Sequence, residues 1–500
     1  MRLAATVVAA LLVPSAFVAA AWGGQTSQPT IRFGVADDTG KYAPDGGSAF
    51  FAQLASIGLD EDRMTVLWDA SHPTTITEST FLDRSIAQAV KDGIDIRLAI
   101  RPARANGIGL SAVRAREFGT FTALVAKRYP QVHTFVIGNE PNQPRFWQPQ
   151  YVKGKAVAAQ GYEQALADSY DDLKAVDPTI VVIGGVLSSR GNDDAAASTN
   201  ASRSPLRFIH DLGLAYAKSK RTKPLMDEFG FHAYPRSNRD SLARGLQWPG
   251  AGFSNLARIK QALWDAFGGS AQPTVETGLR ISIDEVGWQT AIPAASKSSY
   301  TGLENVPVTS DAVQAKIYGQ IIADAACDPS IADVLFAPFV DESQLGGFQS
   351  GLVRADGTLR PSYAVVQNAL ANGGPRCHGA RVRWQHSTTV SGARVFFGSA
   401  SAVHWRYQKV WSFAVRAGED ATYRASIVPV SGRGVLSVRA ALRAHPVLSA
   451  RGLAKANWTP LVRFPARRLN PGRYAYVVTL TAALAPARHR VFVSRTFVVH

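Results

Sequence analysis

The stretch Thr134–Asn142 reads TFVIGNEPN, a short apolar run that ends at a glycine and passes directly into polar residues. A helical pattern over Ala112–Lys127 precedes it. A buried strand that follows a helix is the repeating unit of parallel α/β proteins. The stretch therefore predicts a parallel sheet, with Asn139 and Glu140 at the carboxyl end of one of its strands.

The same unit recurs on both sides of this stretch, between Thr30 and about Ala371. The apolar runs are rich in Val, Ile and Leu and do not alternate with polar residues, which is typical of strands buried on both faces. Besides Thr134–Ile137, the strand candidates are Ile31–Ala36, Arg63–Trp68, Ile94–Ile100, Ile180–Val186, Phe229–His232, Leu279–Ile283 and Ile331–Phe339. Eight such units over roughly 340 residues predict a (β/α)8 barrel with long loops.

A doubly wound sheet is the competing α/β fold. It would carry a glycine-rich phosphate turn after its first strand. The segment Phe33–Asp38 reads FGVADD and lacks that glycine spacing. We therefore expect a barrel over residues 25–374.

The C-terminal part of the chain has a different sequence pattern. A chain of 500 residues is too long for one ordinary core, and the segment Asn372–Pro375 (NGGP) favours a domain boundary. Beyond it, short strand candidates are separated by turns: Val382–Trp384, Ala393–Phe397, Trp411–Val415, Ala421–Val428, Gly434–Leu442, Tyr474–Leu480 and Val491–Val499. Such spacing predicts a β-sandwich over residues 380–500.

The first 21 residues have the pattern of a signal peptide. Arg2 gives a positive start, Leu3–Val13 is an uncharged apolar run, and Ala19–Ala21 offers a small-residue cleavage site. A membrane anchor is the alternative, but Pro14 interrupts the run, and even Leu3–Trp22 barely reaches the ~20 residues that span a bilayer. We expect cleavage near Ala21 and a secreted, extracellular protein.

The two cysteines, Cys327 and Cys377, each follow a helix-like stretch. If those are the last two helices of one barrel, their ends could be neighbours. Export exposes a protein to oxidising conditions, so we expect a disulfide, with two buried thiols as the alternative. No Cys or His cluster has zinc spacing, and we expect no metal or organic cofactor.

The chain is basic, with a formal net charge of +16 and a pI near 9.9. From Arg381 to His500 the only acidic residues are Glu419 and Asp420. No nucleic-acid module is present, so we expect no nucleic-acid partner. Contact of this basic domain with anionic cell-envelope polymers is one interpretation, and a generally basic proteome is the other. We expect a monomer.

A second stretch, Leu279–Trp288, reads LRISIDEVGW and again ends an apolar run with acidic residues. Glu140 and Glu285 thus follow the fourth and seventh predicted strands. These strand ends share one mouth of a barrel, where catalytic residues of this fold lie. Burial of a carboxylate beside such an apolar run costs free energy unless a partner group or a substrate interacts with it. Either acid alone could form a salt bridge at the end of the barrel, but the pair favours a catalytic role.

Two carboxyl groups across one sugar ring are what cleavage of a glycosidic bond needs. One must be protonated to donate to the leaving oxygen, and the other must be ionised to attack the anomeric carbon. Different surroundings can divide these roles by raising the pKa of one group. Since strands four and seven lie on opposite sides of the mouth, their acids can face each other.

The two motifs resemble those of clan A glycoside hydrolases, above all family 39 and family 5. The resemblance covers about residues 30–370 and rests on Asn-Glu-Pro after strand four and Glu-x-Gly-Trp after strand seven. It implies that Glu140 is the acid/base, that Asn139 holds the sugar 2-hydroxyl, and that Glu285 is the nucleophile. The implied enzyme is a retaining O-glycosidase.

Further residues are candidates for substrate binding. His232 and Tyr234 resemble the clan's His-x-Tyr, whose tyrosine bonds the nucleophile; the alternative is a structural histidine beside an ordinary buried tyrosine. Arg101, which closes strand three, could bond the nucleophile, the substrate or a loop acid. Aromatic side chains suit the apolar faces of sugars. The remaining candidates are Trp68, Trp147, Trp288 and Asn142.

Three other acids lie near the same strand ends. Asp284 should point to the helix layer, because successive strand residues face opposite sides. Asp341 and Glu342, after strand eight, could bind sugar hydroxyls or be solvated.

The sequence favours a secreted retaining glycosidase that cleaves β-linked polysaccharide or oligosaccharide. Two alternatives stay open: a carbohydrate-binding surface protein on a glycosidase scaffold with little activity, and a transglycosylase that uses the same residues.

Overall fold

The computed structural model describes residues 31–371, 374–397, 403–405, 408–431, 436–464 and 469–499. The predicted signal peptide over residues 1–21 lies outside these ranges, as do Asn372 and Gly373 of the predicted boundary.

Eight parallel strands form a closed barrel in the order β1-β10-β9-β8-β7-β4-β3-β2. Their bounds are β1 (Arg32–Ala36), β2 (Glu61–Trp68), β3 (Asp95–Pro102), β4 (Thr134–Ile137), β7 (Val181–Ser188), β8 (Glu228–His232), β9 (Arg280–Val286) and β10 (Ile331–Phe336). Each of the eight predicted strands is present, and β4 matches its predicted bounds. The (β/α)8 barrel is thereby confirmed.

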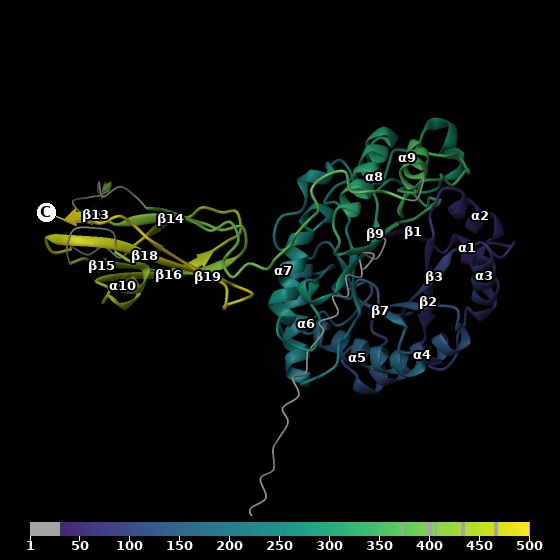
Figure 1. Cartoon of the computed structure of the whole chain (residues 1–500), viewed down its shortest axis with the longest axis horizontal. Coiled ribbons are helices and arrows are strands. Elements are labelled where there is room, and N and C mark those ends of the chain that lie inside the picture. Colours follow the sequence, from purple (N-terminus) through teal and green to yellow (C-terminus); the bar gives the residue numbers. More distant parts are fainter. Residues whose placement is uncertain are drawn as a thin grey trace, which may run out of the picture. The chain divides into compact units, whose positions relative to one another are not determined.

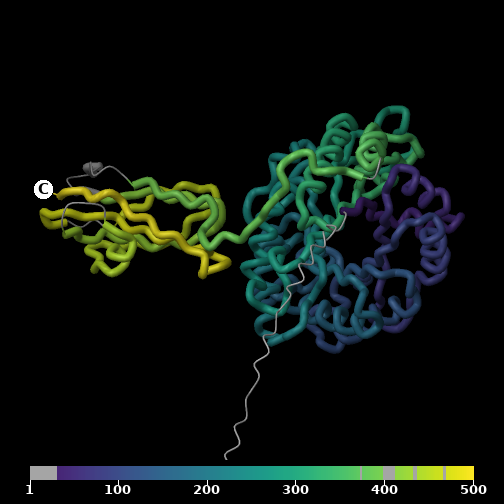
Figure 2. The backbone as a smooth tube through the Cα atoms, viewed as in Figure 1, coloured from purple at the N-terminus to yellow at the C-terminus, as the bar shows by residue number. Residues whose placement is uncertain are grey.

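Helices surround this ring of strands (Figure 1). They are α1 (Thr39–Tyr42), α2 (Ser48–Ser56), α3 (Ser79–Lys91), α4 (Ala112–Arg128), α5 (Ala158–Val176), α6 (Pro205–Ser219), α7 (Leu256–Phe267), α8 (Asp311–Ala326) and α9 (Pro361–Leu370). A hairpin of β5 (Tyr151–Val152) and β6 (Lys155–Ala156) lies between β4 and α5. Figure 2 shows the chain passing once around the ring, from purple through teal to green.

The side chains of each strand point alternately into two regions, the lumen of the barrel and the core between the strands and the helices. On β2, Met64, Val66 and Trp68 point outward into the hydrophobic core that the helices cover. Glu61 and Arg63 point inward, because strand side chains alternate. The lumen therefore contains ion pairs: Arg97 of β3 pairs with Glu61 and, at 3.1 Å, with Asp333 of β10.

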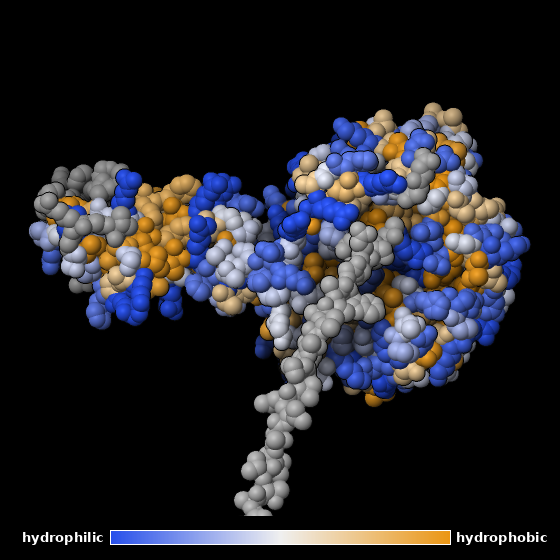
Figure 3. Space-filling model, in the orientation of Figure 1, coloured by the Kyte–Doolittle hydropathy of each residue, from blue (hydrophilic) through white to orange (hydrophobic). Residues whose placement is uncertain are grey.

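The C-terminal residues form antiparallel sheets, as expected for a β-sandwich. One contains β11 (Arg394–Phe397), β14 (Ser412–Arg416) and β17 (Leu461–Arg463). The larger contains β15 (Ala421–Pro429), β16 (Leu448–Ala454), β18 (Gly472–Ala482), β19 (His489–Val493) and β20 (Phe497–Val499), and a separate pair contains β12 (Val403–Trp405) and β13 (Gln408–Val410). Phe413 and Val415 of the first sheet share one core with Ile427 and Val478 of the larger. Figure 3 shows apolar residues gathered over these sheets on the face in view.

Two strand predictions in this region were wrong. Val382–Trp384 forms no strand, and the described part of Gly434–Leu442 lies mostly in the helix α10 (Val438–Arg443). The side chain of Ser437 accepts a hydrogen bond from the amide of Ala440, so it caps the first turn of α10. Ala441 of this helix packs on Ala475 and Val477 of β18, which stabilises the helix on the sheet.

Cys327 and Cys377 form a disulfide, which confirms the predicted pairing. It joins the residue after α8 to the segment that follows α9. Within the ranges that the structure describes, no helix combines the length and apolar character needed to cross a bilayer.

Candidate active site

Glu140 lies at the carboxyl end of β4 in an unusual backbone conformation. Gly138 has φ 89° and Glu140 has φ 40°, so both residues adopt the left-handed region, which non-glycine residues rarely enter. The amide of Glu140 donates to the carbonyl of Val186 on the adjacent strand β7, at 2.8 Å. This turn fixes the Glu140 side chain at the barrel mouth, where it is 16% exposed.

Glu285 lies on β9 and is held at both carboxyl oxygens. Arg63 of β2 donates to one oxygen at 2.7 Å, and the hydroxyl of Tyr234 donates to the other at 2.9 Å. The side chain stays 18% exposed. Both donors hold the carboxylate in place and aim it at the mouth.

Asp284 also faces the lumen, so the prediction that it points to the helix layer was wrong. Alternation counted from Ser282, which bonds Arg97 and Asp333 in the lumen, already turns Asp284 inward. A β-bulge then turns Glu285 inward as well: β9 has one extra residue relative to β8 between Ser282 and Glu285, and one extra relative to β10 between Ile283 and Val286. A bulge re-aims side chains and breaks the period of two. Two successive acids therefore share the same interior.

His232, at the end of β8, lies between the two glutamates. Its Nδ1 is 3.0 Å from an oxygen of Glu140 and 3.4 Å from an oxygen of Glu285. The imidazole has no exposed surface. The two predicted acids are thus brought together at one nitrogen, from opposite sides of the barrel.

The charges around His232 and Tyr234 shift their pKa values. Burial alone would lower the pKa of His232, but the attraction of Glu285 and contacts with Asp284 and Glu140 outweigh it and raise this pKa to about 9. Burial and the charge of Glu285 raise the pKa of Tyr234 well above its usual value. Tyr234 therefore remains a neutral hydroxyl donor.

Arg63 is a central residue of the site that the sequence predictions missed. Besides Glu285, it donates to the amide oxygen of Asn139 at 2.7 Å, and its Nε lies 2.9 Å from Asp284. Because Arg63 holds the Asn139 oxygen, the NH₂ of this side chain points away from Arg63 and can face a ligand. An arginine inside an otherwise apolar strand was the signal that could have identified Arg63.

Two sequence-predicted residues have other contacts than expected. Arg101 donates to the carbonyl of Pro102 and lies over the ring of Phe146. The contact with Glu285, one of the three interpretations of Arg101, is made by Arg63 instead. Asn142 is fully buried. Its amide binds the backbone of Ser188, Arg190 and Arg203, so it organises the loop after β7 and leaves no group for a substrate.

The three predicted tryptophans belong to the core. Trp68, Trp147 and Trp288 are at most 2% exposed. Trp68 packs edge-on against Phe118, Trp147 packs edge-on against Tyr162, and the indole of Trp288 donates to the carbonyl of Asp240. Their burial does not support the expectation that they line the substrate site.

A cavity of about 410 Å³ lies beside Glu285. Acidic side chains dominate its polar lining, which includes Asp37, Asp38, Thr39, Tyr42, Arg63, Thr65 and Glu342. Asp37 is occupied, because it accepts hydrogen bonds from the amides of Phe339 and Val340 at 2.9 Å. The cavity can hold a hydroxyl-rich ligand next to the Glu285 carboxylate.

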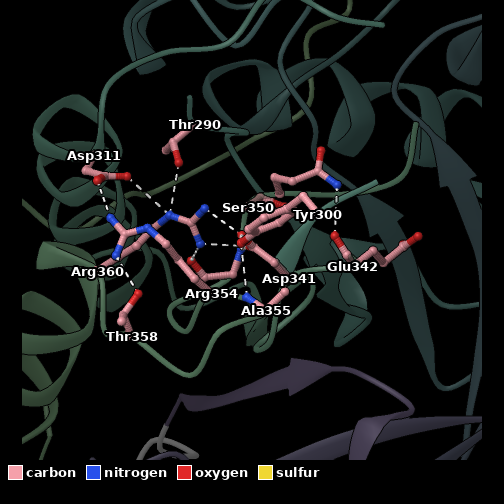
Figure 4. Close-up of polar contacts among 12 residues, drawn as sticks. Thr290, Tyr300, Asp311, Asp341, Glu342, Ser350, Arg354, Ala355, Thr358 and Arg360 are labelled. Carbon is pink, nitrogen blue, oxygen red and sulfur yellow. Dashed lines mark hydrogen bonds and ion pairs between the residues drawn. The ribbon is translucent and has the colours of Figure 1, made fainter. Parts of the chain in front are cut away.

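Asp341 lies in the wall of this cavity, but its carboxylate is bonded within the protein, so it is neither solvated nor available to sugar hydroxyls. It is buried and receives two hydrogen bonds from Arg360, at 2.8 and 2.6 Å, and one from the Tyr300 hydroxyl at 2.6 Å. Figure 4 shows this cluster, with the Glu342 side chain extending away from it. The cluster fixes the loop after β10, and Glu342 is the exposed acid at the rim.

No protein-family model and no curated protein matches the chain. Solved structures do resemble it. A family 39 glycoside hydrolase from Bacteroides cellulosilyticus is 14% identical with a TM-score of 0.48, over 88% of this chain and 81% of that one. An endo-1,4-β-mannanase from Rhizomucor miehei is 14% identical with a TM-score of 0.44, over 68% and 94%.

A β-glucuronidase from Bacteroides uniformis is 13% identical with a TM-score of 0.45, over 94% of this chain but only 46% of that one. The chain thus spans less than half the length of this third protein. Their names describe enzymes that act on glycosides. Because the identities and TM-scores are low, only the geometry of the site can indicate an activity.

Proposed function

We propose that this protein is a retaining glycoside hydrolase that cleaves β-glycosidic bonds in polysaccharides or oligosaccharides. The observation that carries the proposal is the approach of Glu140 and Glu285, from opposite sides of the barrel mouth, to one nitrogen of His232. The acidic cavity beside Glu285 offers room for a sugar.

In the first step, the ionised Glu285 attacks the anomeric carbon while Glu140 gives its proton to the leaving glycosidic oxygen. The bond from the anomeric carbon to that oxygen breaks, and an ester bond to Glu285 forms. Arg63 and Tyr234 keep the nucleophilic carboxylate aimed, since each binds one of its oxygens. The free NH₂ of Asn139 is placed to donate to a sugar hydroxyl.

In the second step, Glu140 removes a proton from water and the resulting oxygen attacks the anomeric carbon, which releases Glu285 as a carboxylate. The spacing favours this double displacement. Two oxygens at 3.0 and 3.4 Å from one nitrogen are no farther apart than the sum of those distances. Inverting enzymes keep their carboxyl groups ~6.5–9.5 Å apart, whereas retaining enzymes need ~5–5.5 Å.

Replacement of the nucleophile tests the proposal. On a panel of aryl β-glycosides, Glu285→Gln should lose turnover while its circular dichroism and melting temperature stay close to those of the wild type. Glu117→Gln on the exposed face of α4 is the matched control and should keep full activity. Azide should restore turnover to Glu285→Ala and give the glycosyl azide of inverted configuration.

Two outcomes would contradict the proposal. Appreciable activity of Glu285→Gln on a good substrate would exclude Glu285 as the nucleophile. A first sugar product of inverted anomeric configuration, observed by proton NMR of the wild-type reaction, would exclude the retaining mechanism.

A further inference from the structure

One buried carboxyl group of the site has no role in the proposed reaction. Asp284 lies next to the nucleophile in the bulge of β9, faces the lumen, and has no exposed surface. It cannot touch a substrate, so any contribution must pass through its neighbours.

The charged neighbours of Asp284 are cations or the imidazole. Its carboxylate lies 2.9 Å from Arg63 Nε, 3.6 Å from His232 Nε2 and 3.8 Å from Arg97 Nη1. Neither oxygen has an aligned hydrogen bond with any residue that the structure describes. The contacts are therefore electrostatic, and they keep the pKa of Asp284 below its usual value although burial opposes this.

Both nitrogens of His232 face carboxylates. Nδ1 faces Glu140 and Glu285, and Nε2 faces Asp284. A neutral imidazole would point a lone pair at one of these oxygens, whereas an imidazolium has a proton on each nitrogen. The surroundings therefore favour the imidazolium, with Arg63, Arg97 and the Tyr234 hydroxyl as the other polar groups around the acids.

The proposed reaction moves negative charge from one glutamate to the other. Before the first step Glu285 is charged and Glu140 is protonated; afterwards Glu285 is esterified and Glu140 is charged. The Nδ1 proton of His232 is within reach of both oxygens, so the same donor can serve each carboxylate in turn. A neutral imidazole with its proton on Nε2 would lose this donor.

We propose that Asp284 is a positioning residue that holds His232 as an imidazolium, so that one fixed cation serves both glutamates during turnover. The inference rests on the proposed function for its role in catalysis, but the charge state itself does not. Asp284→Asn keeps the shape and removes the charge.

The charge state can be measured by NMR on full-length protein with ¹⁵N-labelled histidine. The chain has 10 histidines, so the His232 signals are assigned by their absence from His232→Gln. In the wild type at pH 7, both His232 nitrogens should be protonated. In Asp284→Asn the imidazolium should lose its proton with a dissociation constant at least tenfold larger, and the alkaline limb of kcat/KM should move to lower pH in parallel.

Asp62→Asn is the matched control, since Asp62 is equally buried but alternates with the inward-facing Arg63 on β2. It should leave the His232 titration unchanged. A neutral His232 in the wild type at pH 7 would overturn the inference, and this measurement needs no variant to fold. An unchanged titration in folded Asp284→Asn would overturn it as well.

The two proposals fail separately. If His232 behaves as expected but no glycoside is cleaved, the proposed function is wrong and the charge assignment stands. If the wild type cleaves glycosides and Asp284→Asn changes neither the titration nor the pH profile, the role of Asp284 is wrong.

Discussion

The single guanidinium of Arg63 contacts three other residues of the site. It contacts Glu285, Asn139 and Asp284 through three different nitrogens. Only a planar fork of donors can hold three acceptors in fixed directions, whereas an ammonium group is a point charge. The position of the proposed nucleophile therefore depends on the shape of this side chain as well as on its charge.

Arg63→Lys should lower kcat/KM by about 10²-fold, because a misplacement of a reacting group by about 1 Å can cost that much. Most of the loss should appear in kcat, since Arg63 aims the nucleophile and does not hold the sugar. Steady-state kinetics on an aryl glycoside gives the split.

Arg128→Lys provides the control for this substitution. Arg128 lies at the end of α4 and pairs with Asp83 at the surface. It should change kcat/KM by less than twofold. A similar loss in both variants would show that the effect of Arg63→Lys is not specific to the site.

At the level of single elements, β2 contains a carboxyl group in an unfavourable place. Asp62 has no exposed surface, and neither of its oxygens has an aligned hydrogen-bond partner among the described residues. Burial, with the nearby Asp37 and Asp38, raises the pKa of Asp62 well above its usual range. An acid whose pKa is raised by folding stabilises the fold below its unfolded pKa of about 3.9, and that contribution is lost as the pH rises through the folded value.

Asp62→Asn should therefore raise the free energy of unfolding at pH 7 by about 0.5–3 kcal/mol, the usual size of a single-substitution effect, because the amide needs no proton in order to be buried. The advantage over the wild type should shrink at pH 4, where less free energy is spent on protonating Asp62. Urea unfolding at both pH values measures it. Asp324→Asn, on the exposed face of α8, should change stability by less than about 0.5 kcal/mol. An equal difference at both pH values would contradict the titration argument.

The strands show what pattern alone could and could not predict. Eight runs of Val, Ile and Leu were sufficient to locate the eight strands of the barrel, because buried parallel strands need apolar residues on both faces. The shared orientation of Asp284 and Glu285 could not be predicted, since the rule of alternation assumes a strand without a bulge. The helix α10 was missed because six residues are too few to show a helical period.

The roles of Glu140, Glu285, His232 and Tyr234 were proposed from short motifs, and the structure brings all four together. Trp68, Trp147, Trp288 and Asn142 were assigned from their place near strand ends. Position along the chain does not reveal whether a side chain turns to the mouth or to the core, and these four turn to the core or to loop backbone.

At the level of the whole molecule, the disulfide constrains the end of the barrel. Cys327 and Cys377 are separated by 50 residues and enclose β10 and α9. A covalent link of this kind stabilises chiefly by restricting the unfolded chain.

Replacing both cysteines by serine should lower the free energy of unfolding by about 2–5 kcal/mol. The kcat at 25 °C should stay near that of the wild type, since neither cysteine contacts Glu140 or Glu285. Chemical denaturation with and without a reductant provides the control: reductant should destabilise the wild type and leave the double variant unchanged. A double variant as stable as the oxidised wild type would refute this.

The extra residue in β9 also affects how residual activity of a Glu285 variant should be interpreted. Asp284 is a carboxylate and could in principle attack carbon, yet it is sealed beneath His232 and Arg63. It cannot replace Glu285 as the nucleophile when Glu285 is lost. Faint leftover turnover in a preparation of Glu285→Gln would therefore report deamidation back to glutamate or a trace of wild type, rather than a substitute nucleophile one residue away.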